Sequence, residues 1–207
     1  YLCSDGLHIG QSPLYQGATD PSIENSFWNR DPRLYQTVAD SLRIMGAVGM
    51  NYTAGGSPTG YPTKKFLNDE WFAQDLAYCE NRQSPADAPC IRYAEVLLNY
   101  AEAKYELGEM TQGVLDKTIN LLRDRVGMVH MDLDNLPAGS DIRTEIQRER
   151  RVELFFEGHR YFDIIRWKQG HLLGEDLLGV NRRWLDQNRL AVDLAGLTWK
   201  TKGGEQY

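Results

Sequence analysis

The feature that most constrains this chain is a charged segment, residues 145–168, with the sequence EIQRERRVELFFEGHRYFDIIRWK. At about 100° per residue, a helix through its first part places Glu149 and Glu153 on a single stripe. The other members of that stripe are apolar: Ile142, Ile146 and Phe156. Two carboxylates are therefore expected on the buried face of the helix. Because a buried carboxylate is costly unless it is paired and hydrogen-bonded, the fold must supply cations to both.

Arginines surround these carboxylates in the sequence, and a guanidinium group suits bidentate contact with a carboxylate. We therefore predict a structural ion-pair network at a helix corner. Its expected members are Glu149, Glu153, Arg150, Arg160, Asp163 and Arg166. Gly158 predicts the corner itself, because glycine adopts backbone angles that a residue with a Cβ resists. A second, short helix is expected after it.

Two other interpretations of this segment remain to be weighed. Glu153 and Glu157 lie on one helix face and would serve as the carboxylate pair of a glycoside hydrolase if they flanked a substrate cleft. The arginine cluster would suit nucleic acid, but glutamates interleave with it, and the net charge of the chain is −6. Because nucleic-acid binding depends on neutralising phosphates, this charge balance argues against a nucleic-acid partner.

Two further helices are predicted upstream. In residues 91–107, apolar residues recur three and four apart, which is typical of an amphipathic helix, and Gly108 is expected to end it. A second helix is expected from Val114 to near Gly127. Together they predict an antiparallel αα-hairpin similar to one tetratricopeptide repeat. One repeat cannot bury its own faces, so residues 142–158 are expected to pack against it.

The first 90 residues are expected to be rich in loops, because Gly and Pro punctuate them. One helix interrupts them, capped by Asp31, beginning at Pro32 and running to Arg43. Aromatic rings on loops are flat apolar plates, which suits stacking on sugar rings, unless the rings fold back onto the core. The candidate ligand-binding residues on these loops are Trp28, Tyr15, Tyr52, Tyr61 and Trp71.

No cofactor is expected, and no metal site. The four histidines are scattered, and no Cys/His spacing typical of zinc occurs. Cys79 and Cys90 flank a polar stretch, and they either pair in an oxidising compartment or remain free thiols. No apolar run approaches the ~18 residues that a membrane-spanning helix needs.

Three segments resemble, in the expected order, the C-terminal signature of the SusD/RagB family. They read IRYAEVLLNYAEAKYELGE at 91–109, INLLRDRVGM at 119–128 and RERRVELFFEGHRYFDIIRW at 148–167. Two shorter segments, DPRLYQT at 31–37 and GYPTKKF at 60–66, are similar to upstream pieces of that family.

This resemblance implies a mainly α fold, built of tetratricopeptide-like helical hairpins with long irregular loops and a few short strands. It implies one domain over residues 1–207, the C-terminal part of a SusD-like domain. Its expected parts are a loop-rich region 1–90, a helical core 91–168 and a loop and short-strand tail 169–207. The family's N-terminal half, signal peptide and lipidated cysteine are expected to lie outside this fragment.

The resemblance also implies a function. SusD-like proteins bind glycans or other nutrients without catalysis on the outer leaflet of Bacteroidetes-type outer membranes, and deliver them to a SusC-like TonB-dependent transporter. The expected ligand is an oligosaccharide or polysaccharide, with a peptide left open, and membrane contact is expected only through the lipid anchor. The alternative is a helical-repeat scaffold that binds only protein. Ligand contacts vary between family members, so no binding residue is carried over from the signature.

Overall fold

The computed structural model describes residues 1–17, 26–38, 61, 63, 65–66 and 89–175, within a chain that divides into two units. The first unit comprises Tyr1–Pro21, Asn25–Tyr35 and Pro89–Gln169, and the second comprises Ser22–Glu24, Gln36–Ala88 and Gly170–Tyr207. The helices are α2 (Pro32–Thr37), α5 (Tyr93–Glu106), α6 (Gln112–Asp116), α7 (Ile119–Val126), α8 (Ile142–Glu153), α9 (His159–Arg166) and the 3₁₀ helix η2 (Gly170–Gly174).

The described part is rich in helix and almost free of strand. Its β pairing consists of two isolated antiparallel bridges, Cys3 with Arg30 in the first unit and Val38 with Thr63 in the second. No helix in these ranges is long and apolar enough to cross a bilayer. The prediction of a mainly α fold is confirmed, whereas the tetratricopeptide character of the hairpin stays a prediction. The strands expected after residue 180 lie outside the described residues.

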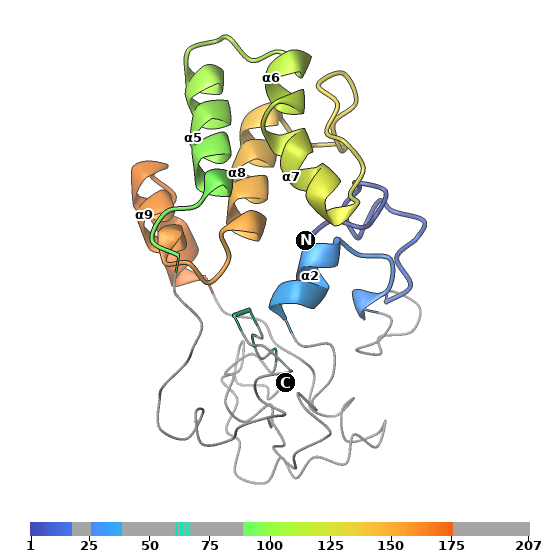
Figure 1. Cartoon of the computed structure of the whole chain (residues 1–207). Helices are drawn as coiled ribbons and strands as arrows, with labels where there is room; N and C mark the ends of the chain where they lie inside the picture. The colour runs from blue at the N-terminus through green and yellow to red at the C-terminus, as the bar shows by residue number, and fades with distance from the viewer. Residues whose placement is uncertain (18–25, 39–60, 62, 64, 67–88, 176–207) are drawn as a thin grey trace, which may run out of the picture. The chain divides into compact units, whose positions relative to one another are not determined.

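Helix α5 is the centre of the first unit, with α7 and α8 packed against it (Figure 1). Leu98 and Ala101 are completely buried, in a cluster shared with apolar residues of α6, α7 and α8. Burying a leucine-sized side chain contributes about 1.5–3 kcal/mol, so this cluster holds the hairpin together. The helix ends as predicted at Gly108, whose φ of +70° suits glycine. The Glu109 N–H then donates to the Lys104 carbonyl at 2.9 Å.

The second helix of the hairpin differs from the prediction, because it is split into α6 and α7. Thr118 lies at the break, with φ −130° and ψ −91°, and its hydroxyl donates to the Val114 carbonyl at 2.6 Å. Threonine side chains that bond to backbone groups compete with the helical hydrogen bonds, which explains the interruption. Gly127, in the left-handed region with φ +70°, ends α7 at the predicted position.

Helix α8 begins at the predicted cap, where the Asp141 carboxylate accepts the Thr144 N–H at 2.7 Å. It ends at Glu153, earlier than the apolar stripe suggested. Phe156 has a φ of +65° and is 62% exposed, so including it in the buried stripe was wrong. The chain has already left the helix at that point. Gly158, with φ +81°, then starts α9, as the predicted corner requires.

Helix α2 begins as expected, with the Asp31 carboxylate accepting the Arg33 N–H at 3.0 Å. It ends at Thr37, so the prediction that it runs to Arg43 was wrong. Val38 is already in a β-bridge with Thr63, and the Thr63 hydroxyl donates to the Thr37 carbonyl at 2.9 Å. This pairing takes up the backbone groups that a longer helix would have used.

Candidate functional site

Glu149 is 0% exposed, and arginines occupy both of its oxygens. Arg33 Nη1 donates to Oε1 at 2.5 Å, while Arg123 Nε and Nη2 donate to Oε2 at 3.1 and 3.0 Å. Burial acts to raise the pKa of Glu149, but the charges of Arg33 and Arg123 outweigh it and lower the pKa to about 2. This carboxylate is therefore ionised throughout the physiological pH range.

Glu153, one turn further along α8, is held in the same way. Arg92 Nη1 donates to Oε1 at 2.7 Å, Arg33 Nη1 donates to Oε2 at 3.2 Å, and Arg125 Nη2 lies 3.0 Å from both oxygens. Arg92 also holds Glu157 through two further bonds of 2.8 Å. We call Asp31, Arg33, Arg92, Arg123, Arg125, Glu149, Glu153 and Glu157 the ionic core.

The ionic core fits a framework better than a catalytic centre. A glycoside hydrolase needs one carboxylic acid whose pKa is raised, so that it can protonate the leaving group. Burial acts to raise the pKa of Glu153, but Arg92, Arg125 and Arg33 outweigh it and lower that pKa. Glu157 is engaged on both oxygens by Arg92. A carboxylate pair whose oxygens are bonded by shared arginines is poorly placed to donate a proton to a substrate.

The arginines that neutralise Glu149 and Glu153 come from other segments than the sequence suggested. We expected Arg150, Arg160 and Arg166 of the same segment, whereas the bonds are made by Arg33, Arg92, Arg123 and Arg125. One signal was available in the sequence. Arg123 shares the buried stripe of its helix with Ile119 and Leu122, so a carboxylate was to be expected opposite it.

The remaining members of the predicted network gather around α9. Arg150 Nε contacts both oxygens of Asp163, at 3.0 and 2.9 Å, and Arg166 Nε donates to Asp163 at 2.8 Å. Arg166 also pairs with Glu102 of α5, which accepts the Trp167 indole N–H at 2.7 Å. Arg160 makes no ion pair or hydrogen bond with any residue that the structure describes.

Trp28 and Tyr15 lie on loops of the first unit. Trp28 is 59% exposed, whereas its neighbour Phe27 is buried. Arg30 fixes this loop, and its guanidinium lies 5.3 Å from the centre of the half-buried Tyr15 ring. That guanidinium donates to the backbone carbonyls of Tyr1, Leu2 and Ser26. An exposed indole on an anchored loop is a ready-made apolar plate.

The other three candidate rings fall outside the described part of the first unit. Tyr61 is partly exposed and belongs to the second unit. Tyr52 and Trp71 lie outside the described residues. Cys79 lies outside them as well, so its pairing stays a prediction, and Cys90 is an exposed free cysteine in the described part.

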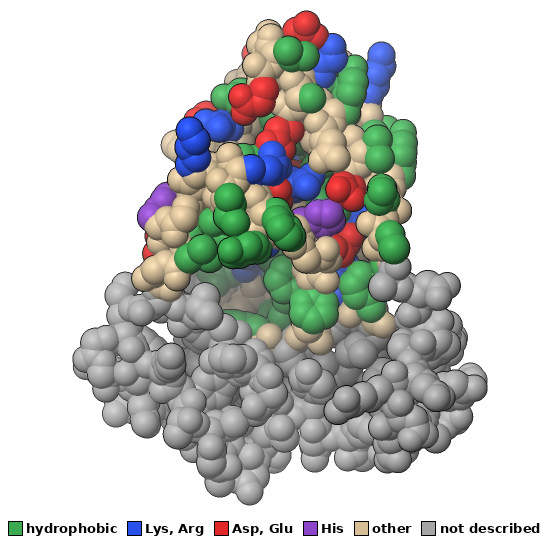
Figure 2. All heavy atoms as spheres, turned by 90° about the vertical axis from the view of Figure 1, so that its left-hand side faces the viewer, with side chains coloured by type: hydrophobic (Ala, Val, Ile, Leu, Met, Phe, Trp, Pro, Cys, Tyr) green, Lys and Arg blue, Asp and Glu red, His purple; other side chains and the backbone are tan. Residues whose placement is uncertain are grey.

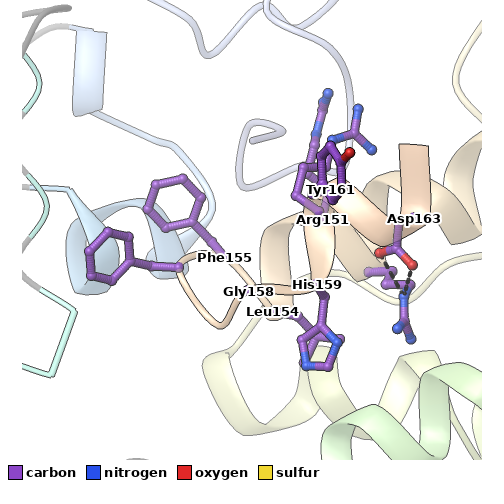
Figure 3. A pocket seen from close by; sticks show the side chains of 10 residues that line it. Arg151, Leu154, Phe155, Gly158, His159, Tyr161 and Asp163 are labelled. Atoms are coloured by element: carbon purple, nitrogen blue, oxygen red, sulfur yellow. Dashed lines mark hydrogen bonds and ion pairs between the residues drawn. The ribbon is translucent and has the colours of Figure 1, made fainter. Parts of the chain in front are cut away.

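A pocket of about 350 Å³ lies at the turn between α8 and α9. Arg151 and Tyr161 stand on one side of the Gly158 turn and His159 on the other, with Asp163 bound to Arg150 beyond them (Figure 3). On the face that carries α9, hydrophobic side chains gather in one area beside charged ones (Figure 2). The exposed apolar residues of α9 are Tyr161, Phe162 and Ile165. No sequence signal had singled out this pocket.

Fold and site together define a mainly α-helical protein whose helices meet around buried ion pairs and whose candidate binding ring stands on a loop. The model of the SusD family matches residues 1–190. The chain therefore belongs to the SusD family.

Named relatives agree with this assignment. SusD-like protein P2 of Formosa agariphila is 37% identical over 113 residues, which are 51% of this chain and 21% of that protein. SusD-like protein P38 of the same organism is 33% identical over 81 residues, which are 36% of this chain and 16% of that protein. The matches therefore span only about a fifth of these relatives.

Solved structures show the same fold. A SusD-like carbohydrate-binding protein of Bacteroides fragilis has a TM-score of 0.59 and 29% identity, over 84% of this chain and 34% of that one. A second SusD-like protein of that organism has a TM-score of 0.54 and 28% identity, over 82% of this chain and 34% of that one.

Proposed function

We propose that this protein binds glycans without catalysis at the cell surface and delivers them to a SusC-like TonB-dependent outer-membrane transporter. Membership of the SusD family and the likeness to a carbohydrate-binding protein of Bacteroides fragilis support the ligand class. The transporter, the outer-membrane location and a lipid anchor are proposed on the same resemblance. The state of Glu149 and Glu153, ionised and saturated with arginine, supports a role without acid–base chemistry.

The exposure of Trp28 on its loop is the observation that supports glycan binding at particular residues. Trp28 presents an exposed side chain on a loop where Arg30 donates to three backbone carbonyls, so the loop that carries the ring is held in place before any ligand arrives. Preorganisation of this kind reduces the entropy lost on binding. A sugar ring stacked on the indole would find the Asn29 and Arg30 polar groups beside it. Tyr15 is proposed as part of the same surface, whereas Tyr52, Tyr61 and Trp71 stay proposals from the sequence.

The test uses the full-length protein and affinity electrophoresis in gels that contain individual polysaccharides. We expect retardation by at least one polysaccharide, and a loss of about tenfold in affinity for Trp28→Ala, because an aromatic contact contributes more than about 1 kcal/mol. Phe162→Ala is the matched control, since Phe162 is an exposed ring on a helix remote in sequence from the loop. Equal retardation of both variants and the wild type would remove Trp28 from the site. Failure of the wild type to bind any glycan would remove the function.

A helical-repeat scaffold that binds protein is the second candidate, and one observation favours it. Tyr93, Val96 and Tyr100 of α5 and its C-cap residue Leu107, spaced three, four and seven apart, form an exposed apolar stripe. Such a stripe suits contact with another helix. If Tyr93→Ser with Tyr100→Ser abolished co-purification of the transporter and left glycan binding intact, this stripe would be a protein interface. Co-purification at the wild-type level would remove it as one.

A further inference from the structure

Two arginines at the α8–α9 pocket have charges that nothing in the described structure neutralises. Arg151 and Arg160 both line the pocket, and neither makes an ion pair or a hydrogen bond with a described residue. Every buried arginine of α8, by contrast, has a carboxylate partner: Arg148 has Glu145, and Arg150 has Asp163. In a chain of net charge −6, this pair is a local excess of positive charge.

The placement of Arg160 beside Arg151 is unfavourable for the protein by itself. Partial burial and then the charge of Arg151 lower the pKa of Arg160, with only Asp163 acting in the opposite direction. Asp163 is already shared by Arg150 and Arg166. Like charges held together without a counterion cost stability, and perturbed charges in a pocket are typical of functional sites. An anion between the two guanidinium groups would remove that cost.

The volume and lining of the pocket indicate which kind of anion it could bind. Its volume of about 350 Å³ lies in the range of small-molecule sites, at about 300–1,000 Å³. Its walls combine charge with rings, because Phe155, His159 and Tyr161 line it together with the arginines. Guanidinium groups match the two oxygens of a carboxylate or the oxygens of a sulfate, and rings offer flat apolar surface to a sugar.

We propose that the pocket between Arg151 and Arg160 binds the carboxylate or sulfate of an acidic sugar unit. The site shares no lining residue with the Trp28 loop, and it goes beyond the proposed function because it adds a charged subsite with its own ligand class. An acidic protein surface would also attract arginines, but a stable protein interface needs about 800 Å² from each partner. A small concave pocket suits a single ring-bearing anion better.

The experiment measures binding of glucuronate, glucose 6-sulfate and neutral glucose to the full-length protein by calorimetry at low and high salt. We expect glucuronate and glucose 6-sulfate to bind, glucose not to bind, and the affinity for both anions to fall with salt. Arg151→Gln and Arg160→Gln should each weaken that binding about tenfold. Arg143→Gln is the matched control, since Arg143 is a half-exposed arginine of the same helix outside the pocket, and it should bind as the wild type does.

A second readout separates a binding role from a structural one. Because neither arginine holds a partner, Arg151→Gln and Arg160→Gln should unfold at the same temperature as the wild type or at a higher one. The proposal is overturned if neither anion binds the wild type, if both arginine variants bind as the wild type does, or if either variant unfolds at a lower temperature. Trp28-dependent retardation by neutral polysaccharides is measured independently, so failure here leaves the proposed function standing.

Discussion

Replacing Glu149 by glutamine tests whether the ionic core holds the first unit together. The substitution keeps the size of the side chain and removes its charge. Arg123, which is almost completely buried, then loses its described carboxylate partner. It keeps the Val129 carbonyl at 3.0 Å and a neutral amide oxygen in place of the carboxylate. Arg33 keeps Asp31 and Glu153. The damage therefore falls mainly on Arg123, a buried cation without a carboxylate.

Two independent estimates give the loss of free energy of unfolding expected for Glu149→Gln. Breaking one side of a buried ion pair costs about 3–5 kcal/mol. The pKa of Glu149 moves from 4.5 to about 2, and at about 1.4 kcal/mol per pKa unit this corresponds to about 3 kcal/mol. At about 3 kcal/mol, where the two estimates agree, and with a urea m value of about 1–3 kcal/mol per molar, the unfolding midpoint of Glu149→Gln should fall by about 1–3 M.

The contribution of Glu149 to the free energy of unfolding also depends on pH. The pKa of Glu149 is lower in the folded protein than in the unfolded chain, so its contribution is fully present above pH 4.5 and is lost as the pH falls toward 2. Glu149→Gln should therefore lose less stability than the wild type across that window.

Urea unfolding of the full-length protein, followed by circular dichroism at pH 7 and at pH 3, measures both effects. Glu109→Gln is the control, because it breaks the exposed Lys104–Glu109 pair and should leave the midpoint unchanged. Glu149→Gln with Arg123→Met should recover part of the loss, since it removes the stranded guanidinium. The reasoning is refuted if Glu149→Gln unfolds at the same urea concentration as Glu109→Gln.

Two further variants test local features of α8 and α9. Gly158→Ala should lower the free energy of unfolding by about 1–2 kcal/mol, because alanine resists the left-handed φ of +81° although a Cβ would meet no neighbour there. Gly10→Ala, also unobstructed but without that φ, should be neutral in the same urea titration. Asp141→Ala should cost about 1 kcal/mol, because it removes the N-cap of α8. Thermal unfolding at pH 7 measures the loss of stability in Asp141→Ala, and a melting temperature equal to that of the wild type would contradict the capping role.

Local rules predicted where α5 and α7 end and where α8 and α9 begin, although not where α2 and α8 end. Gly108, Gly127 and Gly158 all take the left-handed conformation at positions where the sequence pattern stops, and Asp141 caps the helix that it precedes. These outcomes depend on a residue and its near neighbours, which the sequence displays directly. The break at Thr118 was missed because Val114 to Leu122 keeps its apolar period through the interruption.

The arginine partners of Glu149 and Glu153 could not be predicted from the sequence. The buried face of α8 was predicted from Glu149 and Glu153, but Arg33 is 116 residues away from Glu149 in the chain, and Arg92 is 61 residues away from Glu153. Periodicity identifies a face that needs cations without identifying which segment provides them. Likewise, the exposure of Phe156 follows from where α8 ends, which the stripe alone does not determine.

The ionic core also bears on how the first unit assembles. Its charges come from α2 and the residue before it, from the residue before α5, from α7, and from α8 and the turn after it. They reach neutrality only when all four segments meet. A segment docked one turn out of place would bury a guanidinium or a carboxylate without its counterion, at a cost of several kcal/mol. In an apolar core, the same displacement by one turn would only exchange one leucine for another. We infer that the ionic core disfavours misassembled arrangements of these four segments.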